Sequence, residues 1–218
     1  GSASKDTARS WLIDQGVNPD HNRPFLGVTV IDWEMQYPGF ENQKAYEAAI
    51  ASTVRYFIEH YGGTVFFFPQ SYGPSPAEDD RKPAQRIVRQ LSDLQQSIIL
   101  VNTPLPPDLL KALFGQMDIF IGTRMHSNIF ALSMGIPVIA IGYLHKTRGI
   151  AQSIGIEDWV VEIKEINNLQ LIERLIGLWD QRAQIREHLL KTMPLIAEQA
   201  GQAGEILAKD YLKLVKKI

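Results

Sequence analysis

The sequence predicts an α/β fold in which a doubly wound parallel sheet of about six strands is followed by C-terminal helices. Three observations lead to this prediction. Short apolar segments of strand length alternate with longer segments whose apolar residues recur at helical spacing. The strand-like segments are apolar throughout, as in strands that crossover helices bury on both faces. Glycines follow the ends of several helical segments, where a left-handed residue terminates a helix.

The first half of the chain predicts two strands joined by one long helix. We expect a strand at 24–33, a helix at 42–61 that ends before Gly62, and a second strand at 64–68. Residues 69–83 contain four prolines and one glycine, so we expect a long loop there. Loops of this length in compact domains are usually functional or mobile.

The second half of the chain continues the alternation. We expect helices at 84–95, 106–117, 125–134 and 146–154, and strands at 97–102, 118–122, 137–143 and 158–163. From residue 167 to the end the pattern is helical, with a break expected near Pro194.

Composition narrows the class of protein. The 218 residues include 22 Lys plus Arg and 24 Asp plus Glu, and apolar types make up 45%. These values are typical of a globular domain, and the missing basic excess argues against a nucleic-acid partner. The chain has no cysteine, which excludes disulfides and thiolate metal sites. No apolar run reaches the roughly 18 residues of a membrane span.

Basic side chains begin two helices at adjacent strand ends. Arg124 and His126 follow the strand at 118–122, while Lys146 and Arg148 follow the strand at 137–143. The positive end of a helix dipole disfavours cations, so the pattern indicates a built anion site at the carboxyl edge of the sheet. Either arginine could bind a phosphate or carboxylate through two hydrogen bonds, with Lys146 as a point charge. Solvated surface cations are the alternative interpretation.

Two more segments leave strands at the same edge. Gln70 and Ser71 could hydrogen-bond a ligand, although the segment at 69–74 is equally typical of an ordinary turn. Asp32 could serve as a base, but a solvated loop is the better interpretation of residues 32–34. We find no P-loop, no dinucleotide fingerprint and no zinc-protease helix, and therefore predict neither a cofactor nor a metal.

Residues 118–149 resemble the C-terminal signature of the polysaccharide pyruvyl transferases. That family shows Arg-Leu-His after a strand, then Gly-x-Pro-Val-Ile, Tyr-x-x-Lys and a glycine. Here the corresponding residues are Arg124-Met125-His126, Gly135-Ile136-Pro137-Val138-Ile139, Tyr143, Lys146 and Gly149. The segment at 69–74 also resembles a family element. Met125 replaces leucine, and His145 stands where the family often has proline.

The resemblance implies a function and a set of site residues. The family transfers pyruvyl from phosphoenolpyruvate to sugar hydroxyls and forms a ketal on cell-surface or exported glycans. By resemblance Arg124 would bind the donor's phosphate or carboxylate, and His126 would be the general acid or base. Lys146 would assist with the anion, and Tyr143 would contact substrate. An imidazole that titrates near neutrality can both donate and accept protons.

The resemblance also implies an organisation. The family architecture is like that of the GT-B glycosyltransferases, so this chain would be one Rossmann-like half with its site in a cleft. We expect residues 1–23 to be a tag remnant and a linker or helix from a missing N-terminal half. The Rossmann-like domain would span 24–165, and the helices at 166–218 would pack on it or on the missing half. Expected partners are phosphoenolpyruvate and a sugar or lipid-linked oligosaccharide acceptor, in the cytoplasm or peripherally at the inner face of the membrane.

Two alternatives stay open. One is the equivalent half of a nucleotide-sugar glycosyltransferase, although the helix at 125–134 lacks the glutamate that usually holds the ribose. The other is an anion-binding domain without catalysis, because fold does not determine function.

Overall fold

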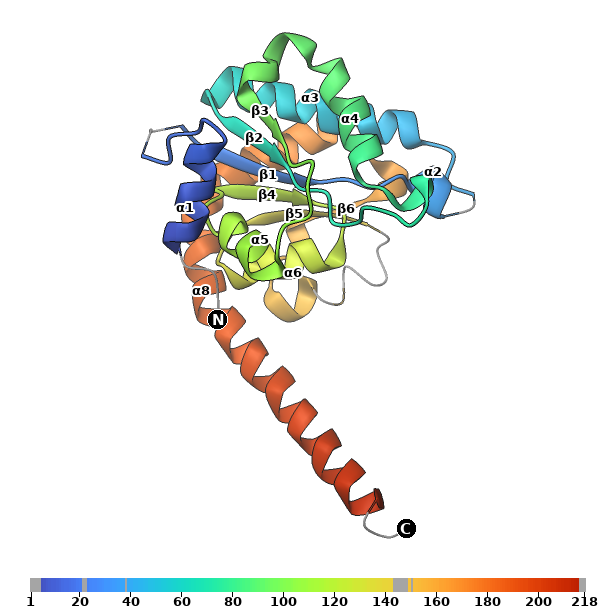
Figure 1. The fold of residues 1–218 in the computed structure, drawn as a ribbon, viewed down its shortest axis with the longest axis vertical. Helices are drawn as coiled ribbons and strands as arrows, with labels where there is room; N and C mark the ends of the chain where they lie inside the picture. The colour runs from blue at the N-terminus through green and yellow to red at the C-terminus, as the bar shows by residue number, and fades with distance from the viewer. Residues whose placement is uncertain (1–4, 21–22, 38, 143–148, 150, 216–218) are drawn as a thin grey trace.

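The computed structural model describes residues 5–20, 23–37, 39–142, 149 and 151–215, with side chains up to residue 202. One six-stranded parallel sheet lies at its centre, in the order β3-β2-β1-β4-β5-β6 (Figure 1). The strands are β1 (Phe25–Thr29), β2 (Thr64–Phe67), β3 (Ile98–Leu100), β4 (Ile119–Gly122), β5 (Val138–Gly142) and β6 (Val160–Glu162). The predicted α/β fold with about six parallel strands is confirmed.

Helices cover both faces of the sheet (Figure 1). The described helices are α1 (Lys5–Asp14), α2 (Trp33–Gln36), α3 (Gln43–Tyr61), α4 (Arg81–Gln90), α5 (Pro107–Phe114), α6 (Met125–Ser133) and α8 (Asn168–Val215). One hydrophobic core joins the sheet to α3, α4 and the first part of α8. A second core joins the other face to α1, α5 and α6. The sheet is therefore doubly wound.

Strand geometry explains why the strand-like segments are apolar throughout. Successive side chains point to opposite faces, so Ile119 and Ile121 enter one core while Phe120 enters the other. All three are 0% exposed. Across the ladder, a Cβ on Gly27 would lie 2.4 Å from the Phe120 ring. The glycine in β1 therefore leaves room for an aromatic side chain on the neighbouring strand.

The strand order places a ligand crevice between β1 and β4. From these two neighbours the chain continues outward in opposite directions, to β2 and β3 on one side and to β5 and β6 on the other. Open parallel sheets bind ligands outside the carboxyl ends of the strands at such a switch point. The segments after β1, β2 and β4 meet at this edge.

Residues 32–34 do not form the solvated loop that we expected. Asp32 is 5% exposed and forms the N-cap of α2, where its Oδ1 accepts a hydrogen bond from the Met35 N–H at 3.1 Å. Its Oδ2 pairs with Nη2 of Arg86 at 2.7 Å. This carboxylate pairs with an arginine that is distant in the chain, and the local sequence does not reveal that pairing.

The predicted break near Pro194 is wrong, because α8 continues through it as one helix. Pro194 removes one backbone donor from the helix ladder. Pro194 is exposed and Leu190, one turn earlier, is 55% exposed, so water can satisfy the carbonyl that loses its partner. Residues 197–202 are exposed along the part of α8 that projects from the body of the molecule (Figure 1).

Helix α1 falls within residues 1–23, which we assigned to a missing half. It packs on this domain, with Ala8 and Leu12 both 0% exposed in the second core. The domain boundary at residue 24 remains a prediction. None of the helices in the described part of the chain combines the length and the apolar character needed to cross a bilayer.

Candidate active site at the carboxyl edge of the sheet

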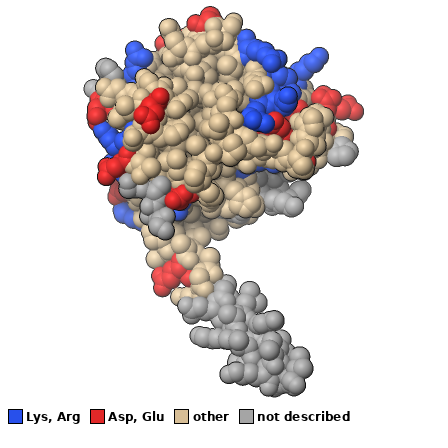
Figure 2. Space-filling model, viewed as in Figure 1, with Lys and Arg blue, Asp and Glu red and all other residues tan. Residues whose placement is uncertain are grey.

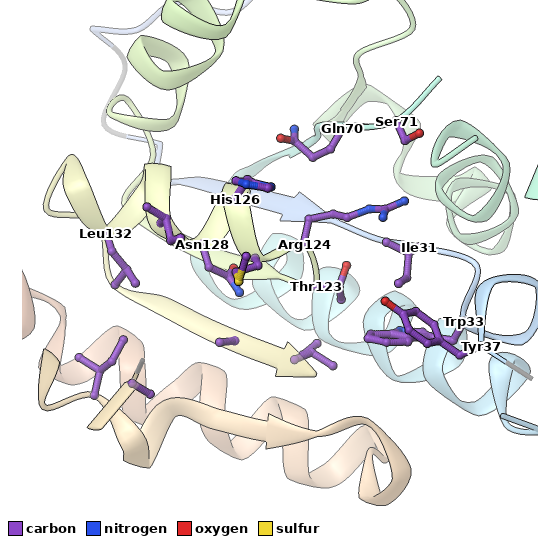
Figure 3. A pocket seen from close by; sticks show the side chains of 16 residues that line it. Ile31, Trp33, Tyr37, Gln70, Ser71, Thr123, Arg124, His126, Asn128 and Leu132 are labelled. Atoms are coloured by element: carbon purple, nitrogen blue, oxygen red, sulfur yellow. The ribbon is translucent and has the colours of Figure 1, made fainter. Parts of the chain in front are cut away.

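A cavity of about 510 Å³ lies at the switch point (Figure 3). It brings together segments that follow β1, β2 and β4 with side chains of α6 and β5. Its lining consists of Ile31, Trp33, Tyr37, Gln70, Ser71, Thr123, Arg124, Met125, His126, Asn128, Ile129, Leu132, Ala140, Ile141, Ala151 and Ile156. Four of the predicted site residues, Arg124, His126, Gln70 and Ser71, therefore share one cavity.

Arg124 is held by a buried aspartate. Its Nη2 lies 2.5 Å from Oδ1 of Asp80, and its Nε donates to Oδ2 at 3.1 Å. The Asp80 side chain is 0% exposed, whereas that of Arg124 is 25% exposed at the cavity. A bidentate pair of this kind fixes the plane of the guanidinium. The remaining donors of Arg124 are thereby oriented before any ligand arrives.

Asp80 is itself anchored by the loop after β2. Its Oδ2 accepts hydrogen bonds from the backbone N–H groups of Gln70 and Ser71, each at 3.1 Å. Burial raises the pKa of the Asp80 carboxyl above its ordinary value, and the hydrogen bond from Arg124 opposes that shift. The proline-rich loop thus supplies the residue that positions the arginine. We did not predict this role for Asp80.

The side chains of Gln70 and Ser71 line the cavity while bonding to their own loop. Gln70 Nε2 donates to the carbonyl of Phe68 at 3.3 Å, and Ser71 Oγ donates to the carbonyl of Gly73 at 3.4 Å. These bonds are those of a turn, and contact of the two side chains with a ligand stays a prediction.

His126 stands exposed in the first turn of α6 and lines the cavity. Arg124 is the N-cap residue of α6, and no side chain caps the helix among the described residues. The hydroxyls of the neighbouring residues Thr123 and Ser127 donate to the carbonyls of Thr29 and Arg124 instead. Uncapped N–H groups and the helix dipole favour an anion at this position.

Buried hydroxyls fasten the start of α6 to β1. Oγ1 of Thr29 and Oγ of Ser127 lie 2.9 Å apart, and the Thr123 N–H donates to Thr29 Oγ1 at 3.2 Å. These contacts fix the turn that carries Arg124 and His126. Met125, between them in the sequence, is 51% exposed and also lines the cavity.

Asn128 packs tightly against the last residue of β4. Its Nδ2 donates to the Gly122 carbonyl at 3.2 Å, and a Cβ on Gly122 would lie 1.7 Å from its Oδ1. Asn128 is 8% exposed. The junction between strand and helix therefore requires glycine, because the asparagine occupies the space of a side chain.

The predicted residues Tyr143, Lys146 and Arg148 lie outside the described residues. Their place relative to the cavity stays a prediction. Among the residues that are described, no group of three or more His, Asp and Glu side chains is arranged to hold a metal ion.

Comparison with known sequences identifies the family. The sequence model of the polysaccharide pyruvyl transferases matches residues 29–145, more than half of the chain. This chain belongs to the polysaccharide pyruvyl transferase family. The matched region contains Arg124, His126 and the loop that holds Asp80.

One relative of this chain is the amylovoran biosynthesis protein AmsJ of Erwinia amylovora. The two are 23% identical over 193 residues, which cover 87% of this chain and 41% of AmsJ. The chain thus spans about two fifths of the length of this relative.

Several solved structures have a fold similar to that of this chain. Heptosyltransferase II of Escherichia coli matches 83% of this chain and 53% of its own, at 14% identity and a TM-score of 0.57. The C-terminal CMP-Kdo binding domain of WaaA from Acinetobacter baumannii matches 87% of this chain and 97% of its own, at 9% identity and a TM-score of 0.55. At these identities the likeness concerns the fold alone, and the assignment of this chain as one half of a two-domain protein stays a prediction.

Proposed function

We propose that this chain is the C-terminal, donor-binding half of a polysaccharide pyruvyl transferase that takes pyruvyl from phosphoenolpyruvate. The product would be a ketal on a sugar of a cell-surface polysaccharide or exopolysaccharide. One observation carries the proposal: Arg124, held by buried Asp80, and His126 line one cavity within the region that matches the family. The name of AmsJ, an amylovoran biosynthesis protein, supports the polysaccharide context.

The donor's charge suits this cavity. Phosphoenolpyruvate carries a phosphate and a carboxylate, and both need cations or N–H donors. Arg124 and the uncapped start of α6 would bind one of them. Lys146, Arg148 and Tyr143, by resemblance, would complete the binding of the donor.

The chemistry requires one proton delivered to carbon and the loss of one phosphate. The oxygen of one sugar hydroxyl adds to C2 of the donor and the hydroxyl gives up its proton, while the donor's methylene carbon gains a proton and becomes methyl. A second hydroxyl of the same sugar then displaces phosphate from C2 and loses its proton, which closes the ketal. We assign the proton transfers to His126, which lines the cavity beside the donor site. Arg124 stabilises the departing phosphate.

The acceptor is a sugar or a lipid-linked oligosaccharide, bound with the help of an N-terminal half. We place the reaction in the cytoplasm, with peripheral contact to the inner face of the membrane for a lipid-linked acceptor. We propose no nucleic-acid partner, metal or cofactor for this reaction.

Calorimetric titration of this chain with phosphoenolpyruvate tests the donor site. We expect phosphoenolpyruvate to bind, and we expect uridine diphosphate and inorganic phosphate to compete with it only weakly. Arg124→Ala should weaken it about tenfold or more, since hydrogen bonds between charged groups are lost. Arg89→Ala, an exposed arginine of α4, is the matched control.

Two further arms separate folding and function. Arg124→Ala leaves the Asp80 carboxylate buried without its cation, which destabilises the fold. The double variant Arg124→Ala with Asp80→Asn removes that buried charge and provides a folded protein for comparison. In the protein that carries this chain, His126→Ala should abolish acceptor-dependent phosphate release, and unchanged turnover would refute its role. Selective binding of uridine diphosphate would instead favour the glycosyltransferase alternative. Binding without turnover would favour the anion-binding alternative.

A further inference from the structure

The cavity has an aromatic wall opposite its polar residues. Trp33, the first residue of α2, and Tyr37, just after its end, both line the cavity (Figure 3). Their ring centroids lie 5.1 Å apart, with the planes tilted by 39°. Trp33 is 3% exposed, whereas Tyr37 is 42% exposed. The tyrosine therefore presents a ring to the cavity mouth, and the buried indole supports it.

A second layer of aromatic rings supports the wall from within the domain. The Trp33 ring lies 6.1 Å from Phe40 and 6.4 Å from Tyr46, centroid to centroid. Phe40 is 6% exposed and Tyr46 is 0% exposed. The indole thus has neighbours on several sides and cannot easily reorient.

A buried polar network fixes the short helix that carries the wall. The backbone N–H of Trp33 donates to Oε1 of Gln43 at 2.9 Å, and Asp32 caps α2. Arg86 pairs with Asp32 at 2.7 Å and with Glu47 at 2.6 Å. These contacts hold the two aromatic residues in place without a ligand. Such preorganisation lowers the entropic cost of binding.

The size of the cavity leaves space beyond the donor. A volume of about 510 Å³ suits a ligand of drug size, which is much larger than a three-carbon phosphoester. Arg124, Gln70 and Ser71 place polar groups across from the aromatic wall (Figure 3). The unfilled part therefore combines one aromatic face with hydrogen-bonding groups opposite it.

We propose that Tyr37, supported by Trp33, is a stacking subsite for a pyranose ring of the saccharide acceptor. A pyranose has an apolar C–H face that packs on an aromatic ring and a rim of hydroxyls that needs polar partners. The wall of Trp33 and Tyr37 provides the surface on which the C–H face packs, and the opposite side of the cavity provides the polar partners for the hydroxyls. The hydroxyls of a ring placed there face the Arg124 and His126 end, where the pyruvyl group is transferred. This assignment rests on the proposed function.

A pyranose fits this wall better than a nucleobase does. Nucleotide sites of this architecture hold the ribose with an acidic residue, and α6 contains none among its nine residues. A nucleobase also needs hydrogen-bond partners along its edge, in the plane of the ring. Beside Tyr37 in Figure 3 lie Ile31, Trp33 and Thr123, and the Thr123 hydroxyl already donates to the Thr29 carbonyl.

The test measures acceptor dependence in the protein that carries this chain. Phosphate release from phosphoenolpyruvate is followed while methyl pyranosides of glucose, galactose and mannose are varied as acceptors. Tyr37→Ala should raise the KM for the best acceptor about tenfold and leave the KM for phosphoenolpyruvate within about twofold. Tyr37→Phe keeps the ring and should restore the acceptor KM. An unchanged acceptor KM in Tyr37→Ala would overturn the proposal.

Met35→Ala is the matched control, because Met35 lies on the same helix, is 58% exposed and does not line the cavity. It should change neither KM. An equal loss in Met35→Ala and Tyr37→Ala would assign the effect to α2 as a whole and overturn the stacking role.

A binding measurement separates this proposal from the proposed function. Saturation-transfer NMR on this chain, with the same methyl pyranosides and with uridine, needs no turnover. If phosphate release fails but the pyranosides receive saturation that Tyr37→Ala abolishes, the subsite stands and the pyruvyl-transfer assignment falls. If uridine alone receives saturation, or no pyranoside does, the subsite proposal is overturned.

Discussion

Arg124 is positioned by Asp80, a residue 44 positions earlier in the chain. The Asp80 carboxylate bonds to Arg124 and to two backbone N–H groups of the loop after β2. In the proposed donor site, an anion would therefore meet an arginine whose negative partner is already in place. Asp80 keeps the guanidinium fixed, and the ligand meets the donors that it leaves unused.

The buried carboxyl of Asp80 makes stability depend on pH. Burial raises its pKa above the ordinary value, so the folded protein binds this proton more readily than the unfolded chain. The stabilisation from this proton is complete below the ordinary carboxyl pKa and is lost as the pH rises through the raised pKa. Across that window, we expect the free energy of unfolding to fall with rising pH relative to Asp80→Asn. Urea unfolding of both proteins at several pH values measures the difference, and a flat difference would contradict the prediction.

Gly122 occupies a position at which the site has no room for a side chain. In Gly122→Ala the new Cβ would lie 1.7 Å from Asn128 Oδ1, so the asparagine must move and lose its bond to the Gly122 carbonyl. We expect a loss of about 1–3 kcal/mol in the free energy of unfolding. Chemical denaturation measures it.

The double variant Gly122→Ala with Asn128→Ala is the control for this clash. Removal of the asparagine side chain leaves room for the methyl group, so the double variant should be more stable than the sum of the two single losses allows. Strict additivity would show that the strain arises elsewhere.

One arginine of α4 connects the short helix α2 to the longer helix α3 through ion pairs. Arg86 of α4 pairs with Asp32 at the start of α2 and with Glu47 of α3, and both carboxylates are 7% exposed. Arg86→Met would leave two carboxylates buried without their cation. Because Arg86 is 38% exposed, water screens part of the effect, and we expect a loss of about 2 kcal/mol in the free energy of unfolding. Chemical denaturation at neutral pH checks it.

Arg55→Met provides the matched comparison for Arg86→Met. Arg55 pairs with Asp93 and Glu59 at the surface, where the carboxylates are 59% and 47% exposed. We expect no measurable change in stability, since water replaces exposed ion pairs. Equal losses in the two variants would indicate that burial of the carboxylates is unimportant.

Helix α8 ties the two faces of the domain together. Its first turns place Leu171, Leu175 and Leu178 in one core, and Leu189 enters the other, each at 0% exposure. Beyond the body the helix projects outward (Figure 1), and in the space-filling view the coloured atoms at the base of this projection stand clear of the rounded domain (Figure 2). Stability should therefore depend on the first part of α8 and not on its end.

Two variants test this division of α8. Leu189→Ala should lower the free energy of unfolding by about 2–5 kcal/mol, because it leaves a cavity in a packed core. A chain shortened after Gln202 should keep the unfolding midpoint of the full chain. Thermal unfolding by circular dichroism compares them, and a lower midpoint in the shortened chain would show that the projection stabilises the domain.

Much of the fold was predictable because its signals are local. Uniformly apolar strand segments and helical periodicity identified the parallel sheet, since a strand buried on both faces carries mostly apolar side chains. The break expected at Pro194 failed, because proline ends a helix only where the lost hydrogen bond cannot be replaced. The solvated loop expected at residues 32–34 failed because its ion-pair partner, Arg86, is distant in sequence.

The local sequence was enough to select Arg124 and His126, because cations at a helix start oppose the dipole and stand out without any structure. It was also enough to bring Gln70 and Ser71 into consideration, since parallel strands share a carboxyl edge. The roles of Asp80, Asn128 and the Trp33–Tyr37 wall depend on which segments meet across that edge. Ion pairs and ring contacts between distant segments depend on distances in space, which only the packed sheet and its helices decide.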